Sequence, residues 1–255
     1  MIKKIAVRGG HNFQATGASA LIDETTEDRK VKDSLIQALR SKGYDVIDVT
    51  PGDCDVLTDL ELGVNKAEDF DADLFISVHF DKAYDHYEGA LGHACWIYGQ
   101  GGQAEVVSNR IVNTVVNGTG FKNRGVRINP DLYELRKTSM PAIIVETCFC
   151  EATEDVAIYK EKGAELVGQL IADGIAGEGA QIKELANNLV NNNDRYAIVT
   201  DSILNVRSGA GLEYPVIGQV KEGDKIKLDC KVGHWWSTYY GEHGGFMYAD
   251  YLKEY

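Results

Sequence analysis

One apolar run, residues 73–80 with the sequence Asp-Leu-Phe-Ile-Ser-Val-His-Phe, constrains the fold more than any other stretch. Residues 74–78 are strand formers, interrupted only by Ser77. A continuous run of this kind is typical of a strand buried on both faces, as in an α/β sheet. His79 then stands at the carboxyl end of the strand, where open α/β sheets bind their ligands. An isolated histidine there is also compatible with a core residue, so its role depends on what converges on it.

Strand-like and helix-like segments alternate along residues 3–175. This alternation predicts an α/β domain with a mostly parallel, twisted sheet flanked by helices. The expected strands lie at residues 3–7, 44–49, 73–79, 94–98 and 142–145, with a short one near 132–135. The expected helices run from about residue 23 to Gly43, from 58 to 68, from 103 to 117 and from 153 to 175.

A second histidine occupies an equivalent place in the predicted sheet. The strand at residues 3–7 runs into Arg8-Gly-Gly-His11-Asn, so His11 also lies just past the carboxyl end of a strand. The two glycines allow the backbone to turn tightly and to approach a ligand closely. The loop has neither of the spacings of phosphate-binding glycine loops, which argues against a nucleotide site.

Two glutamates open the first predicted helix. Glu24 and Glu27 lie in a run that begins at Asp23 and has the cap and first-turn acids of a helix start. The helix dipole favours acidic residues there, which is sufficient to explain both. A carboxylate at this end could also face the strand ends that carry His11 and His79.

A third carboxylate comes at the end of an apolar strand. Residues 142–145 are Ala-Ile-Ile-Val, and Glu146 follows them directly. A glutamate in so apolar a run is costly to bury without a partner. It therefore indicates either a salt bridge or a function.

His86 and His93 are further ligand candidates. The segment from residue 81 to 90 is polar and aromatic, and it is expected to form an exposed loop beside the site. Histidines in loops are usually only solvated, so neither residue is expected to bind a metal.

Two histidines and one or two glutamates at a single rim favour a particular chemistry. Neutral imidazoles and a carboxylate bind Zn²⁺ tetrahedrally and leave the fourth position to water. The metal can lower the pKa of that water to about 7 and polarise a carbonyl oxygen. A second glutamate that is not a ligand then serves as general base, and afterwards as acid toward a leaving amine. The ligands are far apart in sequence and form no HExxH motif.

The motifs of residues 3–175 follow one another in a distinctive order. Gly-His11 comes after a strand, Glu24 opens a helix that ends in Lys-Gly-Tyr44, and Ser-Val-His79 ends the central strand. Tyr133-Glu-Leu-Arg136 and Met140-Pro-Ala-Ile-Ile-Val-Glu146-Thr complete the series. In this order the motifs resemble a zinc-dependent N-acetylmuramoyl-L-alanine amidase of the Amidase_3 type.

The resemblance implies hydrolysis of the amide that joins the lactyl group of N-acetylmuramic acid to L-alanine in peptidoglycan. It implies that His11, Glu24 and His79 bind zinc and that Glu146 is the catalytic carboxylate. Glu24 is preferred to Glu27 because its position along the helix fits the family pattern.

The chain departs from the family pattern at a few positions. Asp28 stands where the family usually has Asn, and His79-Phe-Asp81 replaces the usual His-Ala-Asn. Gly63 and Glu68 replace a common Arg and Asn in the second helix. These departures leave the expected metal ligands intact.

Beyond residue 176 the pattern changes. Residues 177–195 are predicted to link a catalytic domain, residues 1–176, to a small domain, residues 196–255. The small domain has short β runs separated by turns, which is typical of a small all-β barrel. Its segments Leu204-Asn-Val-Arg-Ser-Gly209 and Gly245-Phe-Met-Tyr-Ala-Asp-Tyr-Leu252 resemble a bacterial SH3 (SH3b) domain. That resemblance implies attachment to the cell wall.

Composition argues against several other functions. The net charge of −13 disfavours sequence-independent binding of nucleic acid and adsorption to anionic lipid. No stretch approaches the ~20 apolar residues of a membrane span. The five cysteines form no CxxC pair and are expected to be reduced thiols.

The first residues, Met-Ile-Lys-Lys-Ile-Ala-Val, have neither the apolar stretch nor the cleavage site of a secretory signal. This pattern predicts synthesis in the cytoplasm and, with the resemblance, a phage or prophage endolysin that a holin admits to the wall. The expected partner is bacterial peptidoglycan.

Two other hypotheses remain open at this level. One is a zinc peptidase that cuts the stem peptide or its cross-bridge, and the other is a wall-binding protein whose amidase fold no longer turns over. The presence of both histidines and both key glutamates argues against the second hypothesis.

Overall fold

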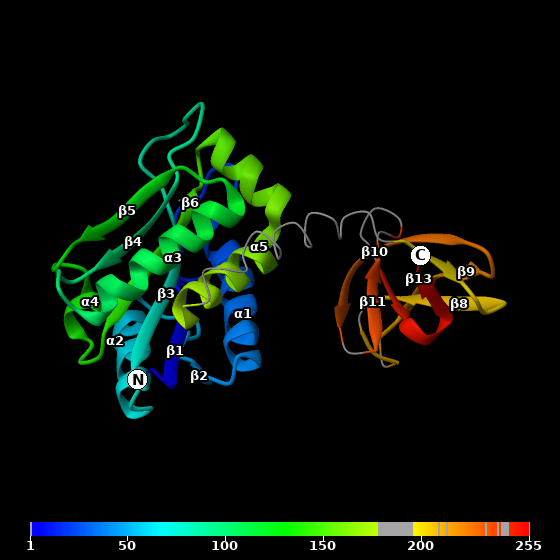
Figure 1. Ribbon diagram of the computed structural model, residues 1–255, viewed down its shortest axis with the longest axis horizontal. Helices are drawn as coiled ribbons and strands as arrows, with labels where there is room; N and C mark the ends of the chain where they lie inside the picture. The colour runs from blue at the N-terminus through cyan, green and yellow to red at the C-terminus, as the bar shows by residue number, and fades with distance from the viewer. Residues whose placement is uncertain are drawn as a thin grey trace. The chain divides into compact units, whose positions relative to one another are not determined.

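The computed structural model describes residues 2–177, 196–208, 210–212, 214–232, 234–238, 240 and 245–254. Contacts divide the chain into two compact units, residues 1–186 and 187–255, which are described separately below. Figure 1 shows an α/β unit followed by an all-β unit. Apart from Gly177, the predicted linker at residues 177–195 lies outside the described residues. The predicted domain boundaries stay a prediction.

The first unit is built on a six-stranded sheet. Its strands are β1 (Lys4–Gly9), β2 (Asp45–Asp48), β3 (Leu74–Asp81), β4 (His93–Ile97), β5 (Asn123–Ile128) and β6 (Ala142–Phe149). Their order is β2-β1-β3-β6-β4-β5. The pairs β2–β1, β1–β3, β3–β6 and β4–β5 are parallel, and the pair β6–β4 is antiparallel. The predicted mostly parallel sheet is confirmed.

Helices cover both faces of this sheet (Figure 1). They are α1 (Glu24–Ser41), α2 (Val56–Asp69), α3 (Gln103–Thr119), α4 (Tyr133–Lys137) and α5 (Thr153–Ala176). Helix α5 packs between α1 and α3, and all three contact the strands. Helices α2 and α4 pack against each other, and α4 contacts β6.

Two local predictions were wrong. Residues 132–135 form the start of helix α4 instead of a strand, and Arg136 N donates to Leu132 O at 3.0 Å to close the turn. Strand β5 was not predicted, because its sequence Asn-Arg-Gly-Val-Arg-Ile is largely polar. It pairs only with β4 and is an edge strand, so it does not need the apolar run of a central strand.

The face of the sheet that packs against α2 and α4 leads to the candidate site. Side chains alternate along a strand, so every second residue of β1, β3 and β6 points to this face. Their apolar side chains form one buried cluster with residues of the two helices. The cluster comprises Ala6, Val49, Ala67, Ala72, Phe75, Leu135, Ala142 and Ile144. Continued toward the carboxyl ends of the strands, the same period of two reaches Arg8, Ser77, His79 and Glu146.

His93 is a core residue and not a solvated loop histidine, which corrects the expectation from sequence. It begins β4, is fully buried, and its Nδ1 lies 3.2 Å from Thr147 O. Burial lowers its pKa from the ordinary 6.5 to about 4. The imidazole is therefore neutral in the folded protein at neutral pH.

This burial predicts a specific loss of stability in acid. In the unfolded chain His93 takes up a proton below its ordinary pKa of 6.5, whereas in the folded chain it takes up a proton only near pH 4. The contribution of His93 to the free energy of unfolding should therefore fall as the pH drops through this window, by an amount on the order of 3 kcal/mol at pH 4. Urea unfolding of the metal-free protein between pH 7 and pH 4.5 measures it.

The matched control is His93→Gln, which has no titratable group at this position and keeps a donor for Thr147 O. The variant should lose less stability than the parent over the same pH range. Equal pH slopes for the two proteins would contradict the prediction.

The second unit is an all-antiparallel sheet, as expected for its class. Its strands are β7 (Tyr196–Val199), β8 (Ile203–Arg207), β9 (Val216–Lys221), β10 (Lys225–Val232), β11 (Trp235–Thr238), β12 (Gly245–Tyr248) and β13 (Leu252–Glu254). They lie in the order β13-β7-β10-β11-β12-β8-β9. A buried cluster that includes Val206, Leu228, Trp236 and Met247 forms the core.

No helix in the described part of the chain combines the length and the apolar character needed to cross a lipid bilayer.

Candidate metal centre

The register between β3 and β6 places His79 directly beside Glu146. Both side chains follow the period of two that carries Phe75 and Ile144 into the cluster under α2 and α4. The two polar residues follow the apolar residues of these strands and lie toward the carboxyl end of the sheet. This is the end predicted from sequence.

His11 reaches the same end from β1 through a tight turn. Gly10 N donates to Val78 O at 2.8 Å, and the chain then turns at His11, whose φ is +57°. A non-glycine residue in this left-handed region costs about 1–3 kcal/mol and is typical of functional sites. The guanidinium of Arg29 holds the turn by donating to Gly10 O at 2.8 Å and to His11 O at 2.7 Å.

Glu24 is the first residue of α1 and points at the two histidines. The helix start is capped by Asp23, which accepts from Thr26 N at 3.0 Å. The carboxylate of Glu24 accepts from Ala18 N at 2.6 Å and from Phe80 N at 3.1 Å. These two backbone donors fix both of its oxygens.

Glu27 lies on another side of the helix. It pairs with Lys30 Nζ at 2.8 Å and accepts from Tyr159 Oη at 2.8 Å. Of the two glutamates left open by the helix pattern, the fold brings Glu24 to the histidines.

Three side chains thus converge. His79 Nδ1 lies 3.0 Å from Glu24 Oε1, and His11 Nε2 lies 3.6 Å from Glu24 Oε2. One ligand atom from each of His11, Glu24 and His79 can be chosen so that all lie within 4.8 Å of one another. Two imidazole nitrogens and one carboxylate oxygen are the donor set of a catalytic zinc site with an open position.

The surroundings also fit a cation. Three carboxylates, Glu24, Glu134 and Glu146, lie around His79 and act on its charge. A Cβ at Gly10 would overlap the His79 imidazole, and one at Gly17 would lie 2.6 Å from His11 Cδ2. The glycines therefore allow the close approach of backbone and ligands. The residues present fit a zinc ion.

This crowding predicts the effect of Gly10→Ala. The added methyl group has to displace the His79 ring, so the variant should bind zinc at least about tenfold more weakly while retaining its fold. Competition with a chromophoric chelator measures the affinity. Gly52→Ala is the matched control, because a Cβ at Gly52 meets nothing within 4 Å. Parent-like zinc affinity in Gly10→Ala would contradict the prediction.

Glu146 differs from Glu24 in its environment. Its Oε2 is buried and has no hydrogen-bond partner among the described residues. Burial raises the pKa of Glu146 to about 8, and the negative charges of Asp81 and Glu24 add to the effect, while His79 and Arg124 oppose it. A carboxyl group whose pKa lies near neutral pH can both take up and release a proton, which suits proton transfer.

Sequence reasoning missed three buried polar residues behind His79. They are Arg8, Ser77 and Glu134, none more than 3% exposed. The sequence feature that could have indicated two of them is a charged residue within or next to an apolar pattern. Arg8 extends the apolar run of β1, and Glu134 interrupts a segment that was interpreted as a strand.

Three departures from the family pattern have local explanations. Asp28 accepts from Arg29 Nη1 at 2.5 Å, and the same guanidinium holds the turn at His11. At Gly63 a Cβ would lie 2.7 Å from Arg8 Nη1, so glycine leaves room for the guanidinium. Glu68 accepts from Ser139 N and Oγ, both at 2.6 Å, and ties α2 to the loop after α4.

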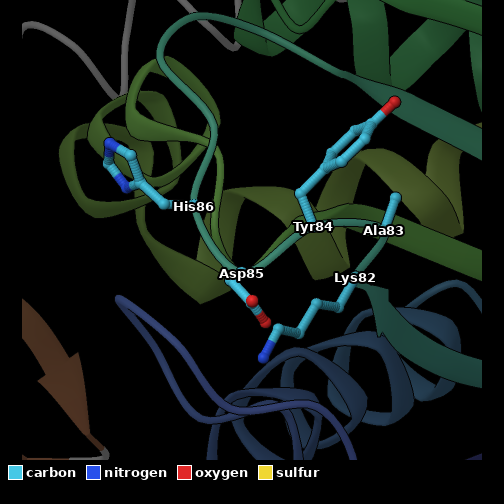
Figure 2. Close-up of a pocket in the computed structure, with 5 residues that line it drawn as sticks. All are labelled: Lys82, Ala83, Tyr84, Asp85 and His86. Atoms are coloured by element: carbon cyan, nitrogen blue, oxygen red, sulfur yellow. The ribbon is translucent and has the colours of Figure 1, made fainter.

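The loop that follows β3 is held by hydrogen bonds to the side chain of Glu151. The carboxylate of Glu151 accepts from Ala83 N at 2.8 Å and Tyr84 N at 3.0 Å, and Tyr84 stacks on Tyr87 with 5.5 Å between ring centroids. A surface depression is lined by residues 82–86. Figure 2 shows the rings of Tyr84 and His86 on opposite sides of this segment. The loop therefore presents aromatic side chains at the surface of the first unit.

Comparison with known families agrees with this geometry. Residues 5–177 match the family model of N-acetylmuramoyl-L-alanine amidases, and residues 202–253 match that of bacterial SH3 domains.

Individual relatives are similar over most of the chain. An uncharacterized protein of Clostridium perfringens is 53% identical over 235 residues, which cover 88% of this chain and 68% of the relative. The endolysin of Bacillus phage SPP1 is 31% identical over 183 residues, which cover 69% of this chain and 66% of the endolysin. Among solved structures, the catalytic domain of the CD27L endolysin shares the fold with a TM-score of 0.61 at 22% identity, covering 69% of this chain and 97% of that domain.

Proposed function

Because the chain belongs to the N-acetylmuramoyl-L-alanine amidase family, we propose that it cleaves the amide between N-acetylmuramic acid and L-alanine with a zinc ion held by His11, Glu24 and His79. The convergence of these three side chains beside Glu146 is the observation that supports the proposal most directly. The enzyme class is a hydrolase of C–N bonds, and its substrate is peptidoglycan.

The different roles proposed for Glu24 and Glu146 follow from their different environments. A bound zinc ion polarises a carbonyl oxygen and lowers the pKa of water. Glu146 is the group that takes a proton from the attacking water and returns it to the departing amino group of L-alanine. The backbone donors of Ala18 and Phe80 hold Glu24 as a ligand, so it is not free for that role.

Substitution of Glu146 tests this assignment. Glu146→Gln keeps the size of the side chain and removes its titratable proton, so the rate of hydrolysis at saturating zinc should fall at least about a hundredfold. Zinc affinity should match the parent, because Glu146 is not a ligand. The rate is measured on purified peptidoglycan as new amino termini, labelled and identified after acid hydrolysis.

The identity of the new amino terminus separates the hypotheses. Free L-alanine termini support the amidase, whereas another amine supports a peptidase that cuts the stem peptide or cross-bridge. Absence of any new terminus, with the parent loaded with zinc, would favour a wall-binding protein without turnover. Glu146→Gln at the parental rate would remove Glu146 from the reaction.

We also propose that the second unit attaches the enzyme to the wall, and that the protein acts as an endolysin. The match of residues 202–253 to bacterial SH3 domains and the likeness to a phage endolysin support both statements. The site of action is then the cell wall.

A chain that ends at residue 177 tests the targeting role. It should retain parental activity on soluble muropeptides, because the candidate site lies wholly in the first unit. It should sediment with purified cell walls far less than the full chain does. Equal sedimentation of the two proteins would remove the targeting role of the second unit.

A further inference from the structure

A line of buried hydrogen bonds leads away from the far side of His79. Its Nδ1 faces Glu24, whereas its Nε2 lies 3.0 Å from Ser77 Oγ. Ser77 Oγ in turn donates to Glu134 Oε1 at 3.1 Å. The second oxygen of Glu134 lies 3.8 Å from His79 Nε2.

The chemistry of these groups sets the direction of the line. An ionised carboxylate only accepts hydrogen bonds, so the hydroxyl proton of Ser77 points to Glu134. The remaining lone pairs of Ser77 Oγ then accept a hydrogen bond from the Nε2–H group of His79. An imidazole with its proton on Nε2 has a free lone pair on Nδ1, and this is the nitrogen that faces Glu24 and the metal centre.

Arg8 holds Glu134 in its charged form and in place. Arg8 Nη1 lies 3.2 Å from Glu134 Oε1, and the guanidinium is 1% exposed. Its other side pairs with the buried Asp59. Gly63 leaves the space that this guanidinium occupies. A buried, immobile cation thus sits at the end of the line His79–Ser77–Glu134.

We propose that Ser77 and Glu134, backed by Arg8, form a positioning layer behind the metal centre that holds His79 with its proton on Nε2 and strengthens zinc binding. The inference rests on the proposed function, because it requires zinc at His79. Hydrogen-bond partners of ligating histidines fix the tautomer and ring orientation, and their loss typically weakens metal binding 10–100-fold. Neither residue touches the reacting atoms.

The test is the zinc affinity of full-length variants, measured by competition with a chromophoric chelator. Ser77→Ala should weaken zinc binding by only about tenfold. The loss is limited because His79 Nε2 can still reach Glu134 by a small shift. Glu134→Gln should lose between about 10-fold and 100-fold. The double variant should resemble Glu134→Gln alone, because both residues act through one line of hydrogen bonds.

A control separates positioning from general loss of a buried charge. Asp173 is also a buried carboxylate, and it contacts Lys42 Nζ at 2.6 Å at the far end of α1 from Glu24. Asp173→Asn should lower the thermal stability of the metal-free protein and leave zinc affinity at the parental value. If it weakens zinc binding as much as Glu134→Gln does, the positioning layer is refuted.

Failure of this inference is distinguishable from failure of the proposed metal centre. If His79→Ala binds zinc as the parent does, the metal centre itself is wrong. If His79→Ala loses zinc while Ser77→Ala and Glu134→Gln keep parental affinity, only the positioning layer is refuted. Should Glu134→Gln not fold, Ser77→Ala decides the question, because it removes no charge and leaves Arg8 paired.

Discussion

The register of three parallel strands is the constraint on which the site depends. Arg8 pairs with Ser77 across β1 and β3, and His79 pairs with Glu146 across β3 and β6. Because side chains alternate with a period of two, all four lie on the face that packs against α2 and α4. A shift of one residue between β3 and β6 would separate His79 from Glu146 and turn one of them to the other face. The packing of the apolar cluster fixes this register, and it therefore also fixes the relative positions of His79 and Glu146.

Burying the charged side chains on this face costs desolvation free energy, so a gain in stability alone does not explain their presence. Arg8 lies between Glu134 and Asp59, and buried ion pairs of this kind are often no more stable than apolar residues of the same size. Removing one partner, by contrast, typically costs about 3–5 kcal/mol. The network continues through Ser77 to His79, where the proposed zinc site requires an oriented imidazole. Its position favours a role in orientation over one in stability.

The sequence was informative where function follows a regular pattern. The positions of His79 and Glu146 at one end of the sheet could be predicted because each follows a run of apolar, strand-forming residues, and the alternation of strands and helices was sufficient for the fold class. The choice between Glu24 and Glu27 depends on the phase of α1 against the sheet, which the helix pattern alone leaves open and the family pattern supplied. Glu134 could not be assigned, because its segment forms a single helical turn whose contact with His79 arises only in the tertiary fold.

Glu24 and Glu146 show how different environments give different properties to the same type of side chain. Burial alone would raise the pKa of Glu24, but its hydrogen bond to His79, the charges of the histidines and the Ala18 backbone donor lower it below the ordinary value. Glu146 is buried without a hydrogen-bond partner for Oε2 among the described residues, and its pKa rises to about 8. A group that stays ionised suits a cation, and a group that holds a proton near neutral pH suits proton transfer. This difference supports the proposed roles, with Glu24 as metal ligand and Glu146 as acid and base.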